Sequence, residues 1–273
     1  MADIKSSNLD ELIEKDGSKI QRDCLKRGDV AVVTGCARGF GRAIARRLAQ
    51  EGAKLAVWDL LDSEGEETAK ICRELGADTQ YIHCDMGNEA DIAKAAKATL
   101  DRFGPVYAVV NNAGINLRTA SIEYSAEQFR RTLNVNLIGS FLTSQAFARE
   151  MIKQKRGVII NLASGRAIEG AVKSIGYGAS KAGIVNMTKT LATEWAQHGI
   201  RVNAIVPGVS ETRQPLEAGG TLEELVGRAG DIPLGRIGHP DDIAGMVAML
   251  LSKDAAYITG QAIAINGGRI MLP

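Results

Sequence analysis

Short apolar runs alternating with helical segments constrain the fold of this chain more than any other sequence feature. The first run, VAVVTG (30–35), ends in glycine and precedes GRAIARRLAQEG (41–52), whose apolar residues have helical spacing. The pattern then predicts strands at about 53–59, 79–84, 106–111, 157–164, 200–207 and 262–265, and helices at about 62–75, 88–103, 125–153, 177–198 and 240–251. Such an alternation indicates a parallel sheet covered on both faces. We predict a doubly wound α/β fold of the Rossmann type, with ligands at the carboxyl ends of the strands.

The length and composition favour one domain. The chain has 273 residues, of which 45% are hydrophobic, enough for a single large core. Residues 1–27 are polar and are interpreted as an N-terminal extension, with the Rossmann-type domain at 28–273. The glycine-rich segment 209–239 is predicted to be a mobile lid.

Charge and cysteine usage exclude several classes of function. A net charge of +1 provides no field to attract nucleic acid or an anionic membrane, and neither is expected as a partner. The start of the chain lacks an apolar signal segment, and no apolar run approaches the ~18 residues of a membrane span. Four cysteines without a C-x-x-C pair and three scattered histidines predict reduced thiols, a cytoplasmic location and no metal site.

A glycine-rich loop joins the first predicted strand to the first predicted helix. It reads T-G-C-A-R-G-F-G (34–41), and glycine lets a backbone approach a pyrophosphate at the positive end of a helix. Because the loop follows a strand and opens a helix, it predicts a dinucleotide site. The expected contacts are Gly35, Arg38, Gly39, Phe40 and Gly41.

The second predicted strand ends in Asp59, eighteen residues beyond Gly41. A carboxylate there can accept hydrogen bonds from both ribose hydroxyls of an adenosine and repels a 2'-phosphate, so NAD is favoured over NADP. Arg38 is the opposing signal, because a guanidinium in the loop could meet a 2'-phosphate; its alternative is a solvated side chain on the loop rim.

Ser164, Tyr177 and Lys181 predict an acid/base group. Tyr177 and Lys181 are one helical turn apart, so the ammonium can lie beside the phenol. A positive charge at roughly 4 Å favours the phenolate by up to ~4 kcal/mol, or about three pKa units. Ser164 offers a hydroxyl that could hold a reacting oxygen against Tyr177. A single Y-x-x-x-K is common on exposed helices, and the rest of the chain makes this one informative.

Together these motifs resemble the short-chain dehydrogenase/reductase family over about residues 28–268. The matching segments are T-G-C-A-R-G-F-G, N-N-A-G (111–114), Asn136 in N-V-N-L, Ser164, Y-G-A-S-K (177–181), Pro207-Gly208 with Thr212, and the terminal A-Y-I-T-G-Q and N-G-G. The resemblance implies reversible oxidation of a secondary alcohol to a ketone with a nicotinamide cofactor.

The resemblance also implies residue roles. Tyr177 would be the general base in oxidation and the acid in reduction, with Ser164 orienting the substrate oxygen. Lys181 would lower the pKa of the phenol and bind the nicotinamide ribose, and Asn136 would hold a water in a proton relay. Further cofactor contacts are expected from Asp85, Met86, Asn112, Ala113, Gly114, Pro207, Gly208, Val209 and Thr212.

Family members are mostly dimers or tetramers, so a homotetramer or homodimer is expected from the resemblance. Its interfaces would correspond to the helices at 125–153 and 177–198, with the C-terminal segment near a partner. Residues 269–273 (RIMLP) carry apolar side chains that look exposed, consistent with such a contact.

Basic residues recur in the loops expected to meet the substrate. They are Arg118, Arg166, Lys173 and Arg213. Guanidinium groups match carboxylate, sulfonate or phosphate oxygens, so an anionic substrate is one hypothesis. The alternative is that these side chains are solvated or paired, for instance with Glu169 or Glu211.

Three functions remain open at this stage. The favoured one is an NAD-dependent dehydrogenase of a secondary alcohol, such as a polyol, sugar or hydroxy acid. The second is an NADPH-dependent reductase of a 3-oxoacyl thioester, and the third is a dinucleotide-binding protein without catalysis. The intact set of Asn136, Ser164, Tyr177 and Lys181 argues against the third, because a binding protein has no need of an acid/base group.

Overall fold

The computed structural model describes residues 24–211 and 227–271. The strands are β1 (Val30–Thr34), β2 (Lys54–Asp59), β3 (Thr79–His83), β4 (Val106–Asn111), β5 (Gly157–Leu162), β6 (Ile200–Pro207) and β7 (Ala262–Ile265). Within the described ranges these seven strands form one sheet in the order β3-β2-β1-β4-β5-β6-β7, and every neighbouring pair is parallel. The prediction of a doubly wound parallel sheet in a single domain is therefore confirmed.

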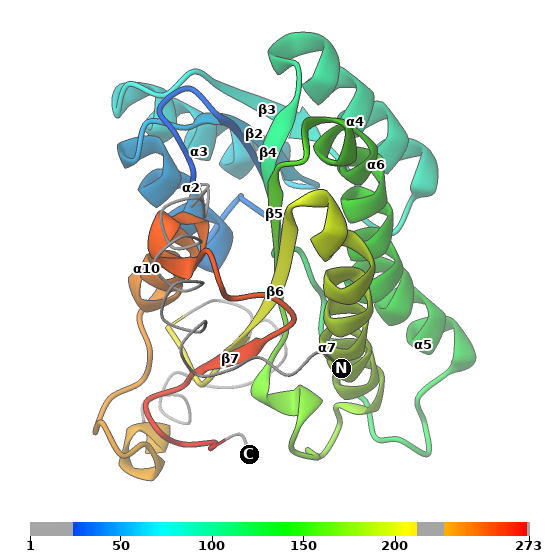
Figure 1. Cartoon of the computed structure of the whole chain (residues 1–273). Helices are drawn as coiled ribbons and strands as arrows, with labels where there is room; N and C mark the ends of the chain where they lie inside the picture. The colour runs from blue at the N-terminus through cyan, green and yellow to red at the C-terminus, as the bar shows by residue number, and fades with distance from the viewer. Residues whose placement is uncertain (1–23, 212–226, 272–273) are drawn as a thin grey trace, which may run out of the picture.

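Helices cover both faces of this sheet (Figure 1). The helices are α2 (Gly39–Gln50), α3 (Asp62–Glu74), α4 (Glu89–Phe103), α5 (Ala126–Leu133), α6 (Gly139–Gln154), α7 (Ile175–Trp195) and α10 (Pro240–Leu251). Short helical turns are η1 (Asn134–Ile138), η2 (Gly165–Ala167), η3 (Ala196–His198), η4 (Arg228–Asp231) and η5 (Lys253–Ala255). In Figure 1, α2, α3 and α10 lie on one side of the sheet, and α4, α6 and α7 lie on the other.

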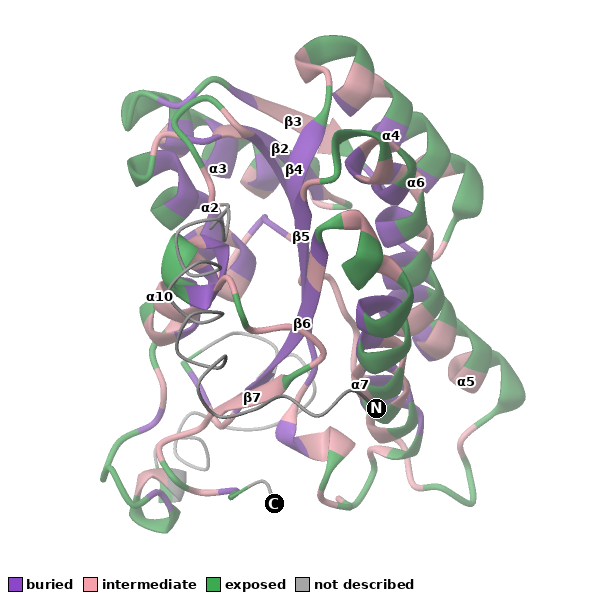
Figure 2. Ribbon diagram, viewed as in Figure 1, coloured by how far each residue is buried: buried purple, intermediate pink, exposed green. Residues whose placement is uncertain are grey.

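The core is divided by the sheet into two main apolar clusters. Side chains that alternate along a strand point to opposite faces, so Val33 belongs to one cluster and Val32 to the other. Both clusters are buried between the strands and the inner faces of the helices, shown in purple in Figure 2. Trp58 is fully buried, and its Nε1 donates a hydrogen bond to Oγ1 of Thr99 on α4 at 3.2 Å, which satisfies its polar atom.

The predicted helix at 125–153 contains a feature that periodicity did not reveal. Ser125 caps α5 in a reciprocal capping box with Gln128, as an N-terminal serine favours. The path then widens into the π-helical turn η1 before α6 begins at Gly139. Such a turn displaces the side chains that follow it from the regular helical face, and Asn136 lies within it. The other predicted elements match the observed ones within about three residues.

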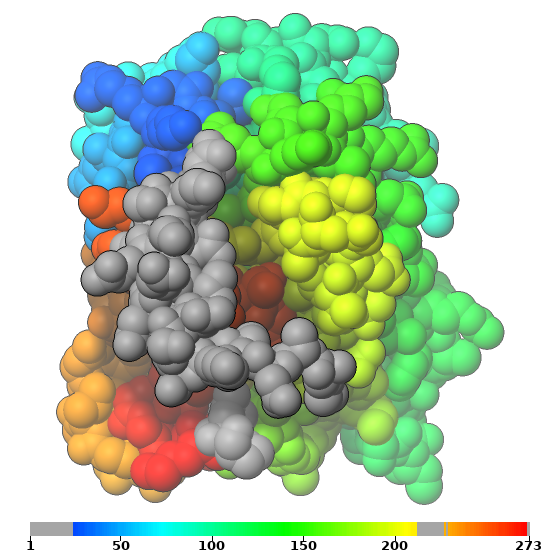
Figure 3. Space-filling model, viewed as in Figure 1, coloured from blue at the N-terminus to red at the C-terminus, as the bar shows by residue number. Residues whose placement is uncertain are grey.

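The last elements of the chain are close to the segment interpreted as a lid. In Figure 3 the orange residues after 226 lie beside the red C-terminal residues. The Leu234 amide donates to the Gly267 carbonyl at 3.1 Å, and the Glu211 amide donates to the Gly238 carbonyl at 2.9 Å.

Residues 212–226 of the predicted lid, together with residues 1–23 of the predicted extension, lie outside the described residues. At the described end of the extension, the Leu25 amide donates to the Leu251 carbonyl at 2.8 Å.

Two helical glycines provide a matched test of the packing at the start of α6. A Cβ at Gly139 would overlap the Met86 carbonyl oxygen, whereas a Cβ at Gly245 on α10 would meet no atom within 4 Å. We expect Gly139→Ala to lower the free energy of unfolding by about 1–3 kcal/mol. Gly245→Ala should raise it by about 0.5–1 kcal/mol, because alanine is the better helix former. Denaturant unfolding monitored by circular dichroism measures both; equal effects of the two substitutions would contradict the close approach at Gly139.

Candidate active site

A cavity of about 570 Å³ opens at the carboxyl ends of the strands. The residues predicted from the sequence that line it are Gly35, Arg38, Gly39, Phe40, Asp59, Asp85, Met86, Asn112, Ala113, Gly114, Arg118, Ser164, Arg166, Tyr177, Lys181, Pro207, Gly208 and Val209. The fold thus brings segments from almost the whole chain to one edge of the sheet. Thr212 and Arg213 lie outside the described residues, so their predicted roles stay predictions.

The glycine loop has the shape that a dinucleotide requires. Gly35 adopts φ +67°, and a Cβ there would lie 2.7 Å from the Ala113 Cα. Gly41 does not line the cavity; a Cβ at this position would overlap the Gly35 carbonyl oxygen, so glycine is needed for the turn itself. No side chain caps the start of α2, and Gly39 and Phe40 line the cavity. The positive helix end therefore faces the cavity, an arrangement that fits a pyrophosphate.

Asp59 lies at the end of β2 and is held by the same loop. Its Oδ2 accepts a hydrogen bond from the Ala37 amide at 2.8 Å, and its Oδ1 accepts one from the Leu61 amide at 3.0 Å. These contacts fix the direction of the carboxylate at the wall of the cavity. The observed position is the one that a ribose-binding acid would need.

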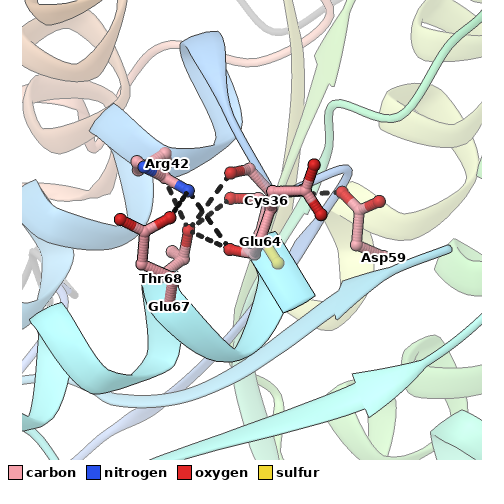
Figure 4. Close-up of polar contacts among 7 residues, drawn as sticks. Cys36, Arg42, Asp59, Glu64, Glu67 and Thr68 are labelled. Atoms are coloured by element: carbon pink, nitrogen blue, oxygen red, sulfur yellow. Dashed lines mark hydrogen bonds and ion pairs between the residues drawn. The ribbon is translucent and has the colours of Figure 1, made fainter. Parts of the chain in front are cut away.

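The loop is also anchored from its other side by α3 (Figure 4). The Thr68 hydroxyl donates to the Cys36 carbonyl at 3.0 Å, and Arg42 Nε donates to the Thr68 hydroxyl oxygen at 3.0 Å. Arg42 also forms an ion pair with Glu67 at 2.8 Å. The glycine loop lies between Asp59 and this network. Contacts within the protein therefore fix the conformation of the loop backbone.

Further dinucleotide candidates follow β3 and β4. Asp85 accepts a hydrogen bond from the Gly87 amide at 2.8 Å and forms an ion pair with Arg131 at 3.1 Å. Asn112 donates through Nδ2 to the Thr34 and Gly35 carbonyls at 3.0 and 2.9 Å. Asn112 therefore ties β4 to the glycine loop. Arg131 lines the cavity and was missed by sequence reasoning, because its link to Asp85 joins residues 46 apart in the chain.

Ser164, Tyr177 and Lys181 meet at the other end of the cavity. Tyr177 and Lys181 share one face of α7, and Lys181 Nζ lies 5.6 Å from the centroid of the Tyr177 ring. Nζ donates a hydrogen bond to the Leu162 carbonyl oxygen at 2.6 Å, at the end of β5. A side-chain hydrogen bond links Ser164 to Tyr177. These positions bring an alcohol-binding hydroxyl, a phenol and an ammonium together.

Burial dominates the electrostatics of this group. It raises the pKa of Tyr177 above the ordinary value near 10, because the phenolate loses its hydration. The hydrogen bond from Ser164 and the positive charge of Arg166 act in the opposite direction. Lys181 Nζ lies 5.6 Å from the centroid of the Tyr177 ring, and its predicted effect on the pKa of the phenol stays a prediction. Burial lowers the pKa of Lys181 to about 8.

Asn136 is fully buried behind the cavity wall. Its Oδ1 accepts a hydrogen bond from the Ile115 amide at 2.8 Å, and its Nδ2 donates to the Ile115 carbonyl at 3.0 Å and to Ser180 Oγ at 2.9 Å. The π-helical turn directs this amide toward the loop after β4. Ile115 was not a sequence candidate, since its contribution is made by backbone atoms.

The basic residues predicted to meet the substrate have different positions. Arg166 and Arg118 line the cavity, and Arg118 is exposed at its rim. Lys173 is exposed, has φ +57° and does not line the cavity, so its predicted contact with the substrate stays a prediction.

The C-terminal segment contributes to the cavity instead. Of the apolar side chains expected to be exposed at the chain end, Ile270 is buried and Met271 is exposed, and residues 272–273 lie outside the described residues. Arg269 lines the cavity and is another residue that sequence reasoning missed as a site residue. Arg269 reaches the cavity because the chain end returns to η2. The sequence gives no local signal of that return.

Comparisons with known proteins agree with this fold and site. A family model described as enoyl-(acyl carrier protein) reductase matches residues 35–269. The D-threitol dehydrogenase of Mycolicibacterium smegmatis is 38% identical over 249 residues, covering 88% of this chain and 92% of that protein. The 3-oxoacyl-[acyl-carrier-protein] reductase FabG of Vibrio cholerae is 38% identical over 246 residues, covering 90% and 98%. A short-chain type dehydrogenase/reductase from Mycobacterium marinum has a similar structure, with TM-score 0.84, 32% identity and coverage of 91% and 97%.

A doubly wound sheet with a glycine loop at one end of the cavity and a serine, tyrosine and lysine at the other defines a nicotinamide-dependent oxidoreductase. The chain belongs to the short-chain dehydrogenase/reductase family. Its cofactor is NAD or NADP. Among the described helices, none has the length and apolar character needed to cross a bilayer.

Proposed function

We propose that the protein oxidises a secondary alcohol, such as a polyol, sugar or hydroxy acid, to a ketone with NAD, and catalyses the reverse reduction. The observation that carries this proposal is the meeting of Ser164, Tyr177 and Lys181 in one cavity with the glycine loop. The name of the related D-threitol dehydrogenase is consistent with a polyol substrate.

The proposed mechanism assigns the proton to Tyr177. Bound NAD would supply the acceptor for the hydride that leaves the carbinol carbon. Ser164 would hold the alcohol oxygen by a hydrogen bond, and the Tyr177 phenolate would accept the hydroxyl proton as the carbonyl forms. In the reduction, the Tyr177 phenol returns this proton to the new alkoxide. Because burial raises the pKa of Tyr177, the base needs cationic neighbours, and Arg166 and Lys181 line the same cavity.

Asn136 and Lys181 have supporting roles in this proposal. Lys181 would hold the nicotinamide ribose and Asn136 a water that links the site to solvent, as in the family pattern. The contacts of Asn136 with both backbone polar atoms of Ile115 support a further, positioning role for this amide, since they fix the loop that follows β4.

The proposed preference for NAD rests on Asp59. Its carboxylate is directed to the cavity wall by two backbone amides, and the residues that follow it, Leu60 and Leu61, carry no positive charge. A 2'-phosphate beside this carboxylate would be repelled. Arg38, which also lines the cavity, is the group that would favour NADP.

A second candidate is an NADPH-dependent reductase of a 3-oxoacyl thioester. The 38% identity to a protein named 3-oxoacyl-[acyl-carrier-protein] reductase and the presence of Arg38 in the loop favour it. Both candidates use the same acid/base group and differ in cofactor and substrate.

We further propose a cytoplasmic homotetramer or homodimer, in keeping with the family pattern.

Replacement of the tyrosine tests the proposed reaction. We expect Tyr177→Phe to reduce kcat/KM for the best substrate in a panel of alcohols, sugars and hydroxy acids by about 10²- to 10⁴-fold, because the proton acceptor is lost. Tyr257→Phe removes the same hydroxyl from a fully exposed side chain and is the matched control, with no change expected. The formation of NADH at 340 nm is the readout. Unchanged turnover in Tyr177→Phe would overturn the mechanism.

A change at Asp59 tests the proposed cofactor. Loss of its hydrogen bonds to ribose should raise the KM for NAD about 10- to 100-fold in Asp59→Ala. Asp59→Asn keeps an acceptor oxygen without the charge, so it should mainly relieve the exclusion of NADP. The ratio of kcat/KM for NAD to that for NADP should fall in both variants. A ratio that stays within about twofold of the original value in both would show that another group selects the cofactor.

A further inference from the structure

The charges that line the substrate end of the cavity share one sign. At the dinucleotide end, the described lining has both signs: the carboxylates of Asp59 and Asp85 and the guanidinium groups of Arg38 and Arg131. The other charged residues in the described lining are all basic; they are Arg118, Arg166, Lys181 and Arg269. A neutral polyol does not call for such a wall, because guanidinium groups in a partly enclosed site favour anions.

Arg166 and Arg269 converge on one carboxylate although they are far apart in the chain. Arg269 Nη1 lies 3.4 Å from Glu169 Oε2, and Arg166 Nη1 lies 4.0 Å from the same oxygen. Both distances exceed the roughly 2.7–2.9 Å of a strong charge-assisted hydrogen bond. Both arginine side chains are 24% exposed, so they are largely enclosed but still reachable from the cavity.

The position of Arg269 is built into the fold. Asn266 Nδ2 donates a hydrogen bond to the Ile270 carbonyl at 2.8 Å, which closes the C-terminal turn. The Ile270 side chain then packs on η2, where its Cδ1 would be only 2.5 Å from a Cβ at Gly165. Since Arg166 follows Gly165 directly, this contact brings the two guanidinium groups to the same part of the wall.

We infer that Arg166 and Arg269 form a binding site for an anionic group of the substrate, a carboxylate, sulfonate or phosphate, and that Glu169 is an internal counter-charge competing with it. The inference rests on the proposed dehydrogenase function and specifies its substrate class. Arg166 follows Ser164 by two residues and lines the same cavity as Tyr177, so an anion bound by Arg166 would lie near the substrate oxygen that Ser164 is proposed to hold. The substrate is therefore a short hydroxy acid or its sulfonate or phosphate counterpart.

A matched pair of ketones tests the site without requiring turnover. The complex of the full-length protein with NAD is titrated calorimetrically with acetoacetate and with acetoacetamide, which differ in charge but little in shape, and with acetonylphosphonate as a second anion. We expect at least one anion to bind more than about tenfold more tightly than the amide. An amide that binds as well as both anions would overturn the inference.

Substitutions assign the preference to the two arginines. Arg166→Gln and Arg269→Gln should each remove most of the preference for the anion while changing the affinity for acetoacetamide less than about threefold. Arg149→Gln removes an exposed guanidinium on α6 and is the matched control, expected to keep the preference. A preference that survives in both Arg166→Gln and Arg269→Gln would also refute the inference.

Glu169 gives a prediction of opposite sign. If its carboxylate competes with the ligand, Glu169→Gln should tighten anion binding by about threefold or more and leave the amide unaffected. A merely structural ion pair would instead weaken the binding of both ketones when broken, and that result would contradict the assigned role.

The inference and the proposed function can fail separately. If the anion preference is absent but NAD-linked turnover of neutral alcohols depends on Tyr177, only the inference fails. If the arginines hold the anion but Tyr177→Phe remains fully active, the anion site stands and the reaction assigned to the protein is wrong.

Discussion

The site depends on a phenol and an ammonium buried together at the carboxyl end of a parallel sheet. Lys181 is only 3% exposed, and moving a charge out of water costs several kcal/mol unless polar atoms replace the water. The Leu162 carbonyl at the end of β5 provides such a contact at 2.6 Å. Burial still lowers the pKa of Lys181 to about 8 and raises that of Tyr177. Burial therefore disfavours the charged form of both groups, the phenolate of Tyr177 and the ammonium of Lys181, and shifted pKa values of this kind are typical of an acid/base site.

Neighbouring polar and charged groups oppose the effect of burial on the pKa of Tyr177. Ser164 and Arg166 lie in the turn that follows β5, and both lower the pKa of Tyr177. The end of β5 therefore contacts Lys181 through Leu162 and leads directly into the groups that act on Tyr177. In the proposed anion site the same Arg166 would hold the substrate. Substrate binding and base activation would then be linked, because an anion at Arg166 weakens the positive field that favours the phenolate. The glycine loop, fixed between Asp59 and Thr68, sets the other end of the cavity independently.

Features with a local sequence signal could be predicted, and features made by distant contacts could not. Buried strands such as 200–207 and the helix at 240–251 are recognisable because their apolar pattern and flanking residues act within a few positions. Gly35 and Asp59 were recognisable from their place between strand and helix. The π-helical turn around Asn136 and the return of Arg269 to η2 depend on packing across the fold. The effect of Arg166 on Tyr177 is of the same kind, since it arises from where η2 places a guanidinium.

The most direct test of this account is the titration of Tyr177 itself, followed by NMR of the protein labelled with ¹³C at the tyrosine ring, with Tyr177→Phe to assign the signal. In the protein alone, burial should keep Tyr177 a phenol beyond pH ~10, the ordinary pKa of tyrosine. Arg166→Gln should move the midpoint to higher pH, because a positive charge that favours the phenolate is lost. Addition of NAD to the unsubstituted protein should lower the midpoint. A Tyr177 signal that titrates at the ordinary value and responds neither to Arg166→Gln nor to NAD would contradict the account.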